Sequence, residues 1–338
     1  MNEKKIREIC KYIKLLKKEA LQTRKKTAVV FNVTTHPKTI EFTIYPIRYT
    51  DEFVCLPIAI KIDKNAIELS KTIDGKTDVI FVDAENKLKH CQNLFYKIKS
   101  TVKQCKVFPI KGNDFAADAA FAIIISKLGP LNKKKICVMS GGNIGSKVAL
   151  KLLEVGTQIF MVNSNIKKSK KIADAINTIK PIECSKSVKA VCVDELPKNL
   201  DCVIGFSRGI PVITNKIMSL LKKGGLVLDG GGGNIQVNSI NEAKKQNLQL
   251  IKLDIRIGFE SNSSLIFNAK KFVSNNMGIK KMNGFDVVSG GYVGNQGDVV
   301  VDSIKNPKKI LGIANGKGEL IKDGINNFKI TKRGIVKK

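Results

Sequence analysis

The chain has 338 residues, 43% of them hydrophobic and 26% charged, which is enough for two domains with cores of their own and is unlike a disordered chain. Its formal net charge is +30, yet only six of the 59 basic residues are arginine, and aromatic residues make up 6% with no tryptophan. Proteins that read nucleic acids usually rely on arginine forks and aromatic stacking, so the scattered lysines indicate a solvated surface and make nucleic acid an unfavoured partner. The same charge would still attract anionic small molecules.

The eight cysteines contain no CxxC pair and most lie in apolar runs, which is typical of buried thiols in a reducing compartment. With two histidines in the whole chain, we predict no metal site. The charged N-terminus does not resemble a signal peptide, and no apolar run has the length of a membrane span. A cytoplasmic protein without a membrane partner is therefore expected.

Residues 1–112 are predicted to form an α/β domain with a mixed sheet that binds the substrate. An amphipathic helix should occupy the first twenty residues, because apolar side chains recur there at helical spacing. Runs rich in β-branched and aromatic residues predict strands, and helical periodicity predicts two further helices. In chain order the expected elements are strands Thr27–Val33, Thr39–Ile47 and Phe53–Ile62, helix Lys64–Lys71, strand Asp78–Asp83, helix Leu88–Val102 and strand Cys105–Ile110.

Residues 113–260 show a regular alternation of strands and helices, which predicts a doubly wound parallel sheet of the Rossmann type. The expected helices are Ala116–Leu128, Ile144–Glu154, Lys167–Ile179, Asn215–Lys222 and Ser239–Gln246. The expected strands are Lys135–Met139, Gln158–Val162, Ala190–Val193, Cys202–Phe206, Leu226–Asp229 and Leu248–Leu253.

Residues 261–338 are expected to hold a return helix, Ser264–Ser274, and a Gly-rich extension of short strands and tight turns that includes Val299–Val301 and Ile310–Ile313. The segment Thr331–Lys338 is predicted to be a loose basic tail. In the extension, Asp298 and Asp302 are candidates either for completing a substrate site or for a contact in a homodimer.

The string KKKICVMSGGNIGSKVALKLLEVGTQIFMVNSN places a buried strand, a Gly-rich turn, an apolar helix and a second strand in order. In this β-α-β context the turn predicts a dinucleotide site, since glycines let the backbone approach the diphosphate and the helix N-terminus supplies amide donors. The alternative is a tight turn in an ordinary sheet. The predicted cofactor-binding residues of the turn are Ser140, Gly141, Gly142, Asn143, Ile144 and Gly145.

The residues that discriminate between NAD and NADP are expected at the end of the second strand, where an acidic residue would select NAD. This chain has Asn163, Ser164 and Asn165 there, followed by Lys167, so no carboxylate opposes a 2′-phosphate. NADP is predicted, with NAD as the alternative. If the turn binds no cofactor, Lys167 is simply the exposed start of a helix.

A later strand ends in GFSRGIPVIT, and ligands of open parallel sheets bind outside the carboxyl ends of the strands. Ser207, Arg208 and Gly209 are therefore predicted to contact the nicotinamide half of the cofactor. The glycines of Asp229–Gly233 end the next strand on the same edge, and they either admit the cofactor or merely turn the chain.

The segment DVIFVDAENK delivers Asp83, Glu85 and Lys87 to the end of a buried strand. A lysine held near carboxylates can donate or relay a proton in hydride-transfer chemistry, so Lys87 is a candidate catalytic residue. The alternative is a charge cluster whose ion pairs satisfy one another.

The stretch GNDFAADAAFAIIISKLG, the Gly-rich turn, the NSN that follows the second strand and GFSRGIPVIT resemble the superfamily of shikimate dehydrogenases and methylene-tetrahydrofolate or methylene-tetrahydromethanopterin dehydrogenases over about residues 110–260. The resemblance implies an amino-acid-dehydrogenase-like N-terminal domain, an NAD(P)-binding Rossmann domain and catalysis between them. In shikimate dehydrogenases an Asp at the start of the interdomain helix works with a Lys of an Asn-Val-Thr-x-Pro-x-Lys motif. Asp118 stands near that Asp position, although Asn113 and Asp114 depart from the family's local sequence.

The segment NVTTHPK, Asn32 to Lys38, is similar to the lysine motif with its proline one place late. Its separation from Asp118 is longer than the family's spacing, which favours an accidental match and leaves Lys87 as the preferred catalytic lysine and Lys38 as the alternative. We therefore predict an NADP-preferring oxidoreductase that acts on a small polar hydroxy acid, with Lys87 and Asp118 relaying the proton. The alternatives are a one-carbon pterin dehydrogenase and, in a different class, a non-catalytic nucleotide-sensing or nucleic-acid-associated protein.

Overall fold

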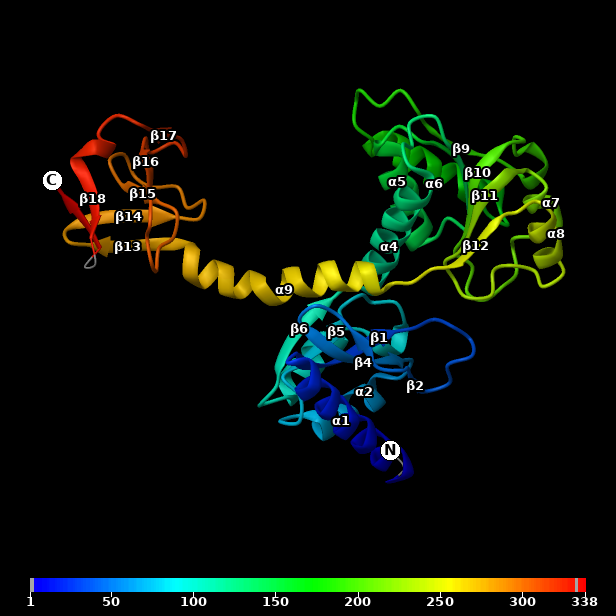
Figure 1. Cartoon of the computed structure of the whole chain (residues 1–338), viewed down its shortest axis with the longest axis horizontal. Coiled ribbons are helices and arrows are strands. Elements are labelled where there is room, and N and C mark those ends of the chain that lie inside the picture. The colour runs from blue at the N-terminus through cyan, green and yellow to red at the C-terminus, as the bar shows by residue number, and fades with distance from the viewer. Residues whose placement is uncertain (1–2, 332–333) are drawn as a thin grey trace. The chain divides into compact units, whose positions relative to one another are not determined.

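The computed structural model describes residues 3–331 and 334–338, and the chain divides into two compact units, Met1–Ser263 and Ser264–Lys338. The first unit contains two separate sheets, and the second is a small β-structure (Figure 1). The further boundary expected near residue 112, between a substrate domain and a nucleotide domain, stays a prediction, although the two sheets have hydrophobic clusters of their own.

The N-terminal sheet has the order β2-β4-β1-β5-β6, with β3 also paired to β4. Strands β4, β1, β5 and β6 are parallel, while β2 and β3 run antiparallel to β4, as expected for a mixed sheet. The strands are β1 (Lys26–Val33), β2 (Phe42–Ile44), β3 (Arg48–Tyr49), β4 (Phe53–Ile60), β5 (Val79–Asp83) and β6 (Lys106–Ile110). The accompanying helices are α1 (Glu3–Thr23), α2 (Asp63–Ile73), η1 (Lys89–Cys91) and α3 (Leu94–Thr101).

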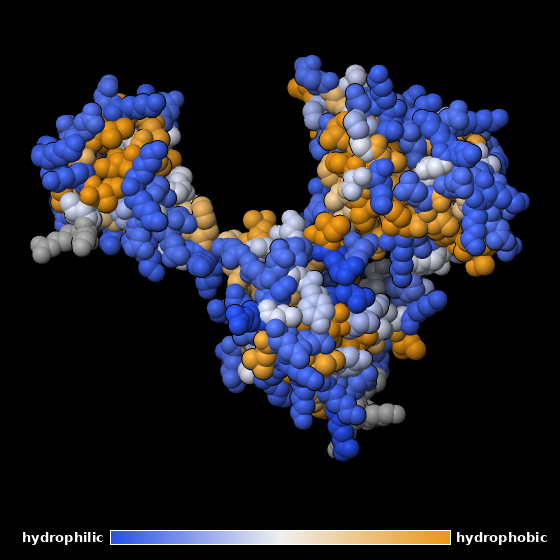
Figure 2. Space-filling model, viewed as in Figure 1, coloured by the Kyte–Doolittle hydropathy of each residue, from blue (hydrophilic) through white to orange (hydrophobic). Residues whose placement is uncertain are grey.

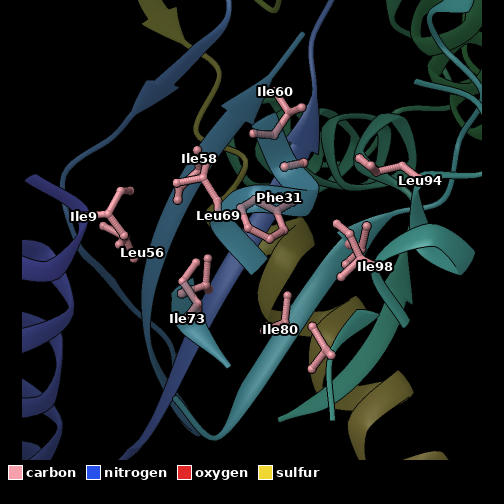
Figure 3. Close-up of a cluster of buried hydrophobic side chains, with 14 of the residues drawn as sticks. Ile9, Phe31, Leu56, Ile58, Ile60, Leu69, Ile73, Ile80, Leu94 and Ile98 are labelled. Atoms are coloured by element: carbon pink, nitrogen blue, oxygen red, sulfur yellow. The ribbon is translucent and has the colours of Figure 1, made fainter. Parts of the chain in front are cut away.

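One face of this sheet is covered by α1, α2 and α3. Alternate residues along the central strands, such as Phe31 of β1 and Ile80 of β5, point into this layer. Figure 3 shows them beside Leu69, Ile73 and Ile98 of the helices, all of which are fully buried. The apolar faces of the helices and the inward-pointing residues of the strands thus form one hydrophobic core.

Aromatic rings fill the opposite face of the N-terminal sheet. Phe81 of β5 contacts Phe53 of β4 edge to face, with ring centroids 5.4 Å apart, and Phe259 of α9 (Arg256–Asn276) in the same manner at 5.7 Å. Phe259 also contacts Phe115 of α4 (Gly112–Leu128) at 5.4 Å. The start of α9 therefore packs against the first sheet. The predicted return helix Ser264–Ser274 lies within α9, but the contacts come from the first turn of α9, which begins eight residues earlier.

The second sheet is entirely parallel, with the order β12-β11-β10-β7-β8-β9. This order is that of the doubly wound dinucleotide-binding fold, and it reverses direction between β7 and β10. The predicted fold class is confirmed. The strands are β7 (Lys135–Met139), β8 (Gln158–Val162), β9 (Val188–Ala190), β10 (Leu200–Gly205), β11 (Leu221–Asp229) and β12 (Gln249–Lys252). The helices are α5 (Asn143–Glu154), α6 (Ile166–Ile179), η2 (Val193–Glu195), α7 (Asn215–Met218) and α8 (Ser239–Lys245).

The C-terminal unit has a sheet of order β13-β14-β15-β16-β17 and a hairpin, β18–β19, around a core that includes Val287, Val299 and Ile335. The expected loose tail at Thr331–Lys338 is wrong, because β19 pairs antiparallel with β18; residues 332 and 333 of that prediction lie outside the described residues. The elements are β13 (Gly278–Met282), β14 (Phe285–Ser289), β15 (Val299–Val301), β16 (Ile310–Ala314), β17 (Leu320–Ile321), η3 (Ile325–Asn327), β18 (Phe328–Thr331) and β19 (Gly334–Lys337).

Two expected elements of the N-terminal sheet layer are divided in the structure. The predicted helix Leu88–Val102 breaks at Asn93, whose φ of +56° belongs to the left-handed region. The predicted strand Thr39–Ile47 survives only as the short β2. Hydrophilic residues cover most of the visible face of each unit (Figure 2), and no helix among the described residues has the length and apolarity needed to cross a bilayer.

Candidate functional site

The Gly-rich turn lies where the strand order of the parallel sheet reverses, between β7 and β10, which is where such sheets bind ligands. Ser140 adopts a left-handed φ of +65°, and its carbonyl accepts a hydrogen bond of 2.7 Å from the Gly142 amide. Gly142 is exposed, and a methyl group added there would meet no atom of the described residues within 4 Å. The turn is therefore tight but not filled by neighbouring side chains.

At the other two glycines of this turn, a side chain would approach atoms of the protein itself. A methyl group at Gly145 would lie 3.0 Å from the Ser140 carbonyl oxygen and 3.4 Å from the Phe206 ring, and one at Gly141 would lie 2.6 Å from the Met161 sulfur. These two glycines let α5 and the turn pack closely against the sheet. At Gly142, by contrast, the space beside the backbone is open to a ligand.

Helix α5 begins directly after Gly142, and among the described residues no side chain caps its N-terminus. The first amides of an α-helix have no partner within the helix, and the helix dipole is positive at that end. An open glycine followed by an uncapped helix N-terminus fits the diphosphate of a dinucleotide. The Ile144 and Asn143 amides belong to this first turn, as the sequence predicts.

The residues expected to select the cofactor lie in the turn between β8 and α6. Asn165 caps α6, since its side chain accepts hydrogen bonds from the amides of Lys167 at 2.9 Å and Lys168 at 3.4 Å. Asn163 donates to the Ser169 hydroxyl at 3.0 Å. Both asparagines therefore stabilise the local structure, while Ser164 and the side chain of Lys167 are exposed at the edge of the sheet.

The loop after β10 is held by the loop after β11. Asn234, which is fully buried, accepts a hydrogen bond from the Ser207 amide at 2.9 Å and donates one to the Ser207 carbonyl at 2.8 Å. The Ser207 hydroxyl donates to the Ile210 carbonyl. Ser207 is thus committed to the loop itself, whereas Arg208 is exposed and Gly209 has a φ of +75°.

Asp229 organises the glycines that follow β11. Its carboxylate accepts hydrogen bonds from the Gly232 and Gly233 amides at 2.8 and 2.7 Å, and longer ones from Gly231 and Asn234. A methyl group at Gly231 would lie 1.9 Å from the Ser207 carbonyl oxygen. Glycine at this position is therefore required by the close approach of the two loops.

Lys87 lies at the carboxyl edge of the N-terminal sheet, in a buried charge cluster. Its Nζ is 2.5 Å from Asp83 Oδ2 and 3.1 Å from Glu85 Oε2, with the Lys87 side chain 13% exposed. Asp83 is fully buried and also accepts from the Val33 amide at 3.1 Å. Burial raises the pKa of the Asp83 carboxyl, against the opposing effect of the Lys87 ammonium.

Gly112, at the start of α4, faces this cluster. A methyl group there would lie 2.9 Å from Lys87 Nζ, 3.2 Å from Asp83 Oδ2 and 3.5 Å from Asn32 Oδ1. Three polar atoms from β1, β5 and the segment after β5 therefore converge on one point beside the start of α4. The absence of a side chain at Gly112 leaves room for them.

A hydrogen-bonded network joins this cluster to the Gly-rich turn. The Asn113 amide donates to Glu85 Oε2 at 2.8 Å, and the Asn113 side chain donates to Asn143, the first residue of α5, at 3.1 Å. One turn into α5, Lys147 bonds Asp114 at 2.5 Å and lies 3.7 Å from Glu85. These contacts thus connect the turn with the charge cluster.

Asp118 does not share this cluster, so the expected pairing with Lys87 is not formed. Its carboxylate is bonded to Lys151 Nζ and to the Asn262 amide group, both at 2.9 Å. The physical reason is the helix rise, because the six residues from Gly112 to Asp118 move the chain about 9 Å along α4. Asp118 joins α4, α5 and α9, and the acidic partners of Lys87 are Asp83 and Glu85.

Sequence reasoning missed two residues of the NVTTHPK segment that the structure places beside glycines of the candidate site. Asn32 contributes to the point beside Gly112, and His36 faces Gly209. Lys38 is exposed. The available signal was that the segment contains the end of a buried strand, Thr27–Val33 in the prediction, and the turn that follows it. No group of three or more metal-ligating side chains occurs within residues 3–331 and 334–338.

No protein-family model and no curated protein matches the chain. Among solved structures, a shikimate dehydrogenase in complex with NADP+ is similar at 14% identity, over 73% of this chain and 91% of the other, with a TM-score of 0.45. The L-tryptophan dehydrogenase of Nostoc punctiforme is similar at 13% identity, over 72% and 74%, with a TM-score of 0.41. A glyoxylate reductase of Paecilomyes thermophila is similar at 14% identity, over 74% and 95%, with a TM-score of 0.32. Such identities are too low to carry a function from one chain to another.

Proposed function

We propose that this protein is an NADP-preferring oxidoreductase that transfers hydride to or from a small polar hydroxy acid. The observation that carries the proposal is the open Gly142 and uncapped start of α5, at the point where the parallel sheet reverses its strand order. An anionic dinucleotide satisfies the amide donors there, and Asn113 connects the charge cluster of Lys87 with the first residue of α5.

Each group of residues has a distinct role in this proposal. The amides of Asn143, Ile144 and Gly145 hold the diphosphate, Ser164 and Lys167 bind the 2′-phosphate, and the loop Ser207–Gly209 borders the nicotinamide. When bound, the nicotinamide supplies or accepts a hydride. Lys87 Nζ donates a proton to the substrate oxygen in the direction of reduction, and the carboxylates of Asp83 and Glu85 position it.

Cofactor binding is tested first, by titrating the protein with NADPH and NADH and following the fluorescence of the bound nucleotide. We expect the Kd for NADPH to be at least tenfold lower than that for NADH, because a cation and no carboxylate faces the 2′-phosphate. The variant Lys167→Glu should reverse this preference. Lys223→Glu, which makes the same charge change near the amino end of β11, should leave it unaltered.

The titration tests the preference for NADP and the assignment as an enzyme separately. Equal affinity for both cofactors would contradict the preference for NADP. Absence of binding to either, together with retention on DNA that falls steeply with salt, would contradict the enzyme assignment and favour a nucleic-acid-associated protein.

Lys87 is tested by turnover with shikimate and quinate as hydride donors. Lys87→Arg keeps a cation beside the buried Asp83, so the fold should be retained, but guanidinium does not release a proton near neutral pH. We expect turnover to fall about 100-fold or more, as is typical when a general acid or base is removed, with the Kd for NADPH unchanged. Unchanged turnover would exclude Lys87 from proton transfer.

The same assay decides the substrate class. Oxidation of methylene-tetrahydrofolate, but of neither hydroxy acid, would select the one-carbon pterin reaction, in which a lysine of the substrate domain can serve equally well.

A further inference from the structure

The segment after β1 is a fixed loop built around His36. The His36 amide donates to the Thr34 hydroxyl oxygen at 3.1 Å, and the Thr39 amide donates to the His36 carbonyl at 3.3 Å. The Lys38 amide donates to His36 Nδ1, also at 3.3 Å. Because Nδ1 is an acceptor, the proton of the neutral ring lies on Nε2. The ring therefore has a defined orientation and a donor at its other nitrogen.

That donor faces the loops of the nucleotide-binding sheet. His36 Nε2 lies 3.0 Å from the point where a methyl group on Gly209 would be, and the Gly232 carbonyl oxygen lies 3.5 Å from the same point. Gly209 also has a left-handed φ of +75°, so a side chain there is excluded by both conformation and space. One residue of the N-terminal sheet layer thus reaches the loops after β10 and β11.

The loops that His36 meets have little freedom to move. Asn234 binds both backbone groups of Ser207, and Asp229 binds the amides of Gly232 and Gly233. The Asn234 amide is buried and bonded through both its oxygen and its nitrogen, and the Asp229 carboxylate accepts from several amides. These hydrogen bonds restrict the movement of the two loops. His36 therefore stands opposite a preformed surface at the carboxyl end of β10.

We infer that His36 is a cofactor-binding residue, whose Nε2–H donates a hydrogen bond to the carboxamide of the nicotinamide. This inference rests on the proposed function and deepens it, because it assigns recognition of the reactive end of the cofactor to the other domain. Lys87 is not available for that role, because two of its three N–H donors face Asp83 and Glu85 and the proposed function assigns the third to the substrate oxygen. A neutral donor of fixed direction matches an amide oxygen and adds no charge beside the ring that changes charge in the reaction.

The test compares NADPH with 2′-phospho-ADP-ribose, which has the same diphosphate and 2′-phosphate but no nicotinamide. In His36→Asn, the side-chain oxygen can still accept from the Lys38 amide, but the Nε2 donor is gone. In His36→Gln, the longer amide restores a donor near the position of Nε2. Binding of both ligands is measured by calorimetry for the full chain and the two variants, with thermal melting as the control for folding.

We expect His36→Asn to weaken NADPH about 5- to 10-fold, the usual effect of losing one hydrogen bond, and to leave 2′-phospho-ADP-ribose unchanged. His36→Gln should recover most of the affinity. Equal weakening of both ligands would show that His36 only shapes its loop, and no change in either would show that it does not contact the cofactor; both results overturn the inference. If the unaltered protein binds neither ligand, the proposed function fails, and the inference fails with it.

Discussion

Glycine occupies different positions of this chain for different physical reasons. Gly231 is required by the Ser207 carbonyl oxygen, which lies 1.9 Å from the position of an added methyl group. Gly112 and Gly145 lie close to Lys87 Nζ and the Ser140 carbonyl oxygen, at 2.9 and 3.0 Å from that position. At Gly142 no such atom of residues 3–331 or 334–338 lies within 4 Å, and its φ of −76° is open to any residue. Packing within the chain therefore does not explain Gly142, whereas the proposed approach of a dinucleotide to the backbone would explain it.

This difference predicts opposite effects of two alanine substitutions in one turn. Gly142→Ala should leave the melting temperature unchanged or slightly higher, because alanine fits the conformation and restricts the unfolded chain. It should weaken NADPH at least tenfold, since the added methyl group lies where the diphosphate approaches the backbone. Calorimetric melting and NADPH titration of the same preparation measure both effects.

Gly145→Ala is the matched control for that substitution. Its methyl group would lie 3.0 Å from the Ser140 carbonyl oxygen and 3.3 Å from the Val138 side chain, so the variant should melt at a lower temperature than the unaltered protein. If Gly142→Ala binds NADPH as tightly as the unaltered protein, the diphosphate does not lie at this turn.

Elements with a continuous apolar pattern could be predicted from the sequence almost to the residue. Strand β7 has the predicted bounds Lys135–Met139, and α5 begins at Asn143, one residue before its predicted start. Their side chains are buried on one helical face or on both faces of a strand, so local periodicity carries the information. Helix α4 was predicted from Ala116, yet it begins at Gly112, because its first turn is polar and lies over the charge cluster.

The candidate site could be predicted only where it follows a strand directly. Lys87 and the Gly-rich turn were found in this way. His36 and Asn32 were not, since their neighbours are distant in sequence. Gly209 approaches His36 only when the two sheets assemble, and Gly112 approaches Asn32 only when β1, β5 and β6 pair in one sheet. The same limit explains Asp118, which has a plausible position along the chain but is bonded to Lys151 and Asn262 in the fold.

At the scale of the whole molecule, the proposed ligand belongs to one unit alone. All residues of the proposed cofactor site lie within Met1–Ser263, and the core of Ser264–Lys338 is built from its own strands. A ligand that binds a native unit stabilises that unit by mass action and leaves an independently folded unit unaffected. Calorimetry can therefore separate the two units without dividing the chain.

We expect two endotherms on heating, because each unit has a core of its own. From average unfolding enthalpies per residue, they should measure about 180 kcal/mol for the larger unit and about 50 kcal/mol for the smaller one, so size identifies them. NADPH at about 100 times its Kd should stabilise the larger unit by about 2.7 kcal/mol and raise its transition by about 5 to 10 °C. The smaller transition should not move, and Gly142→Ala, with at least tenfold weaker binding, should reduce the shift of the larger one by about half or more at the same NADPH concentration. A separate smaller transition that also rises with NADPH would mean that the ligand stabilises the C-terminal unit as well, and the Gly-rich extension would then have to be counted as part of the binding site.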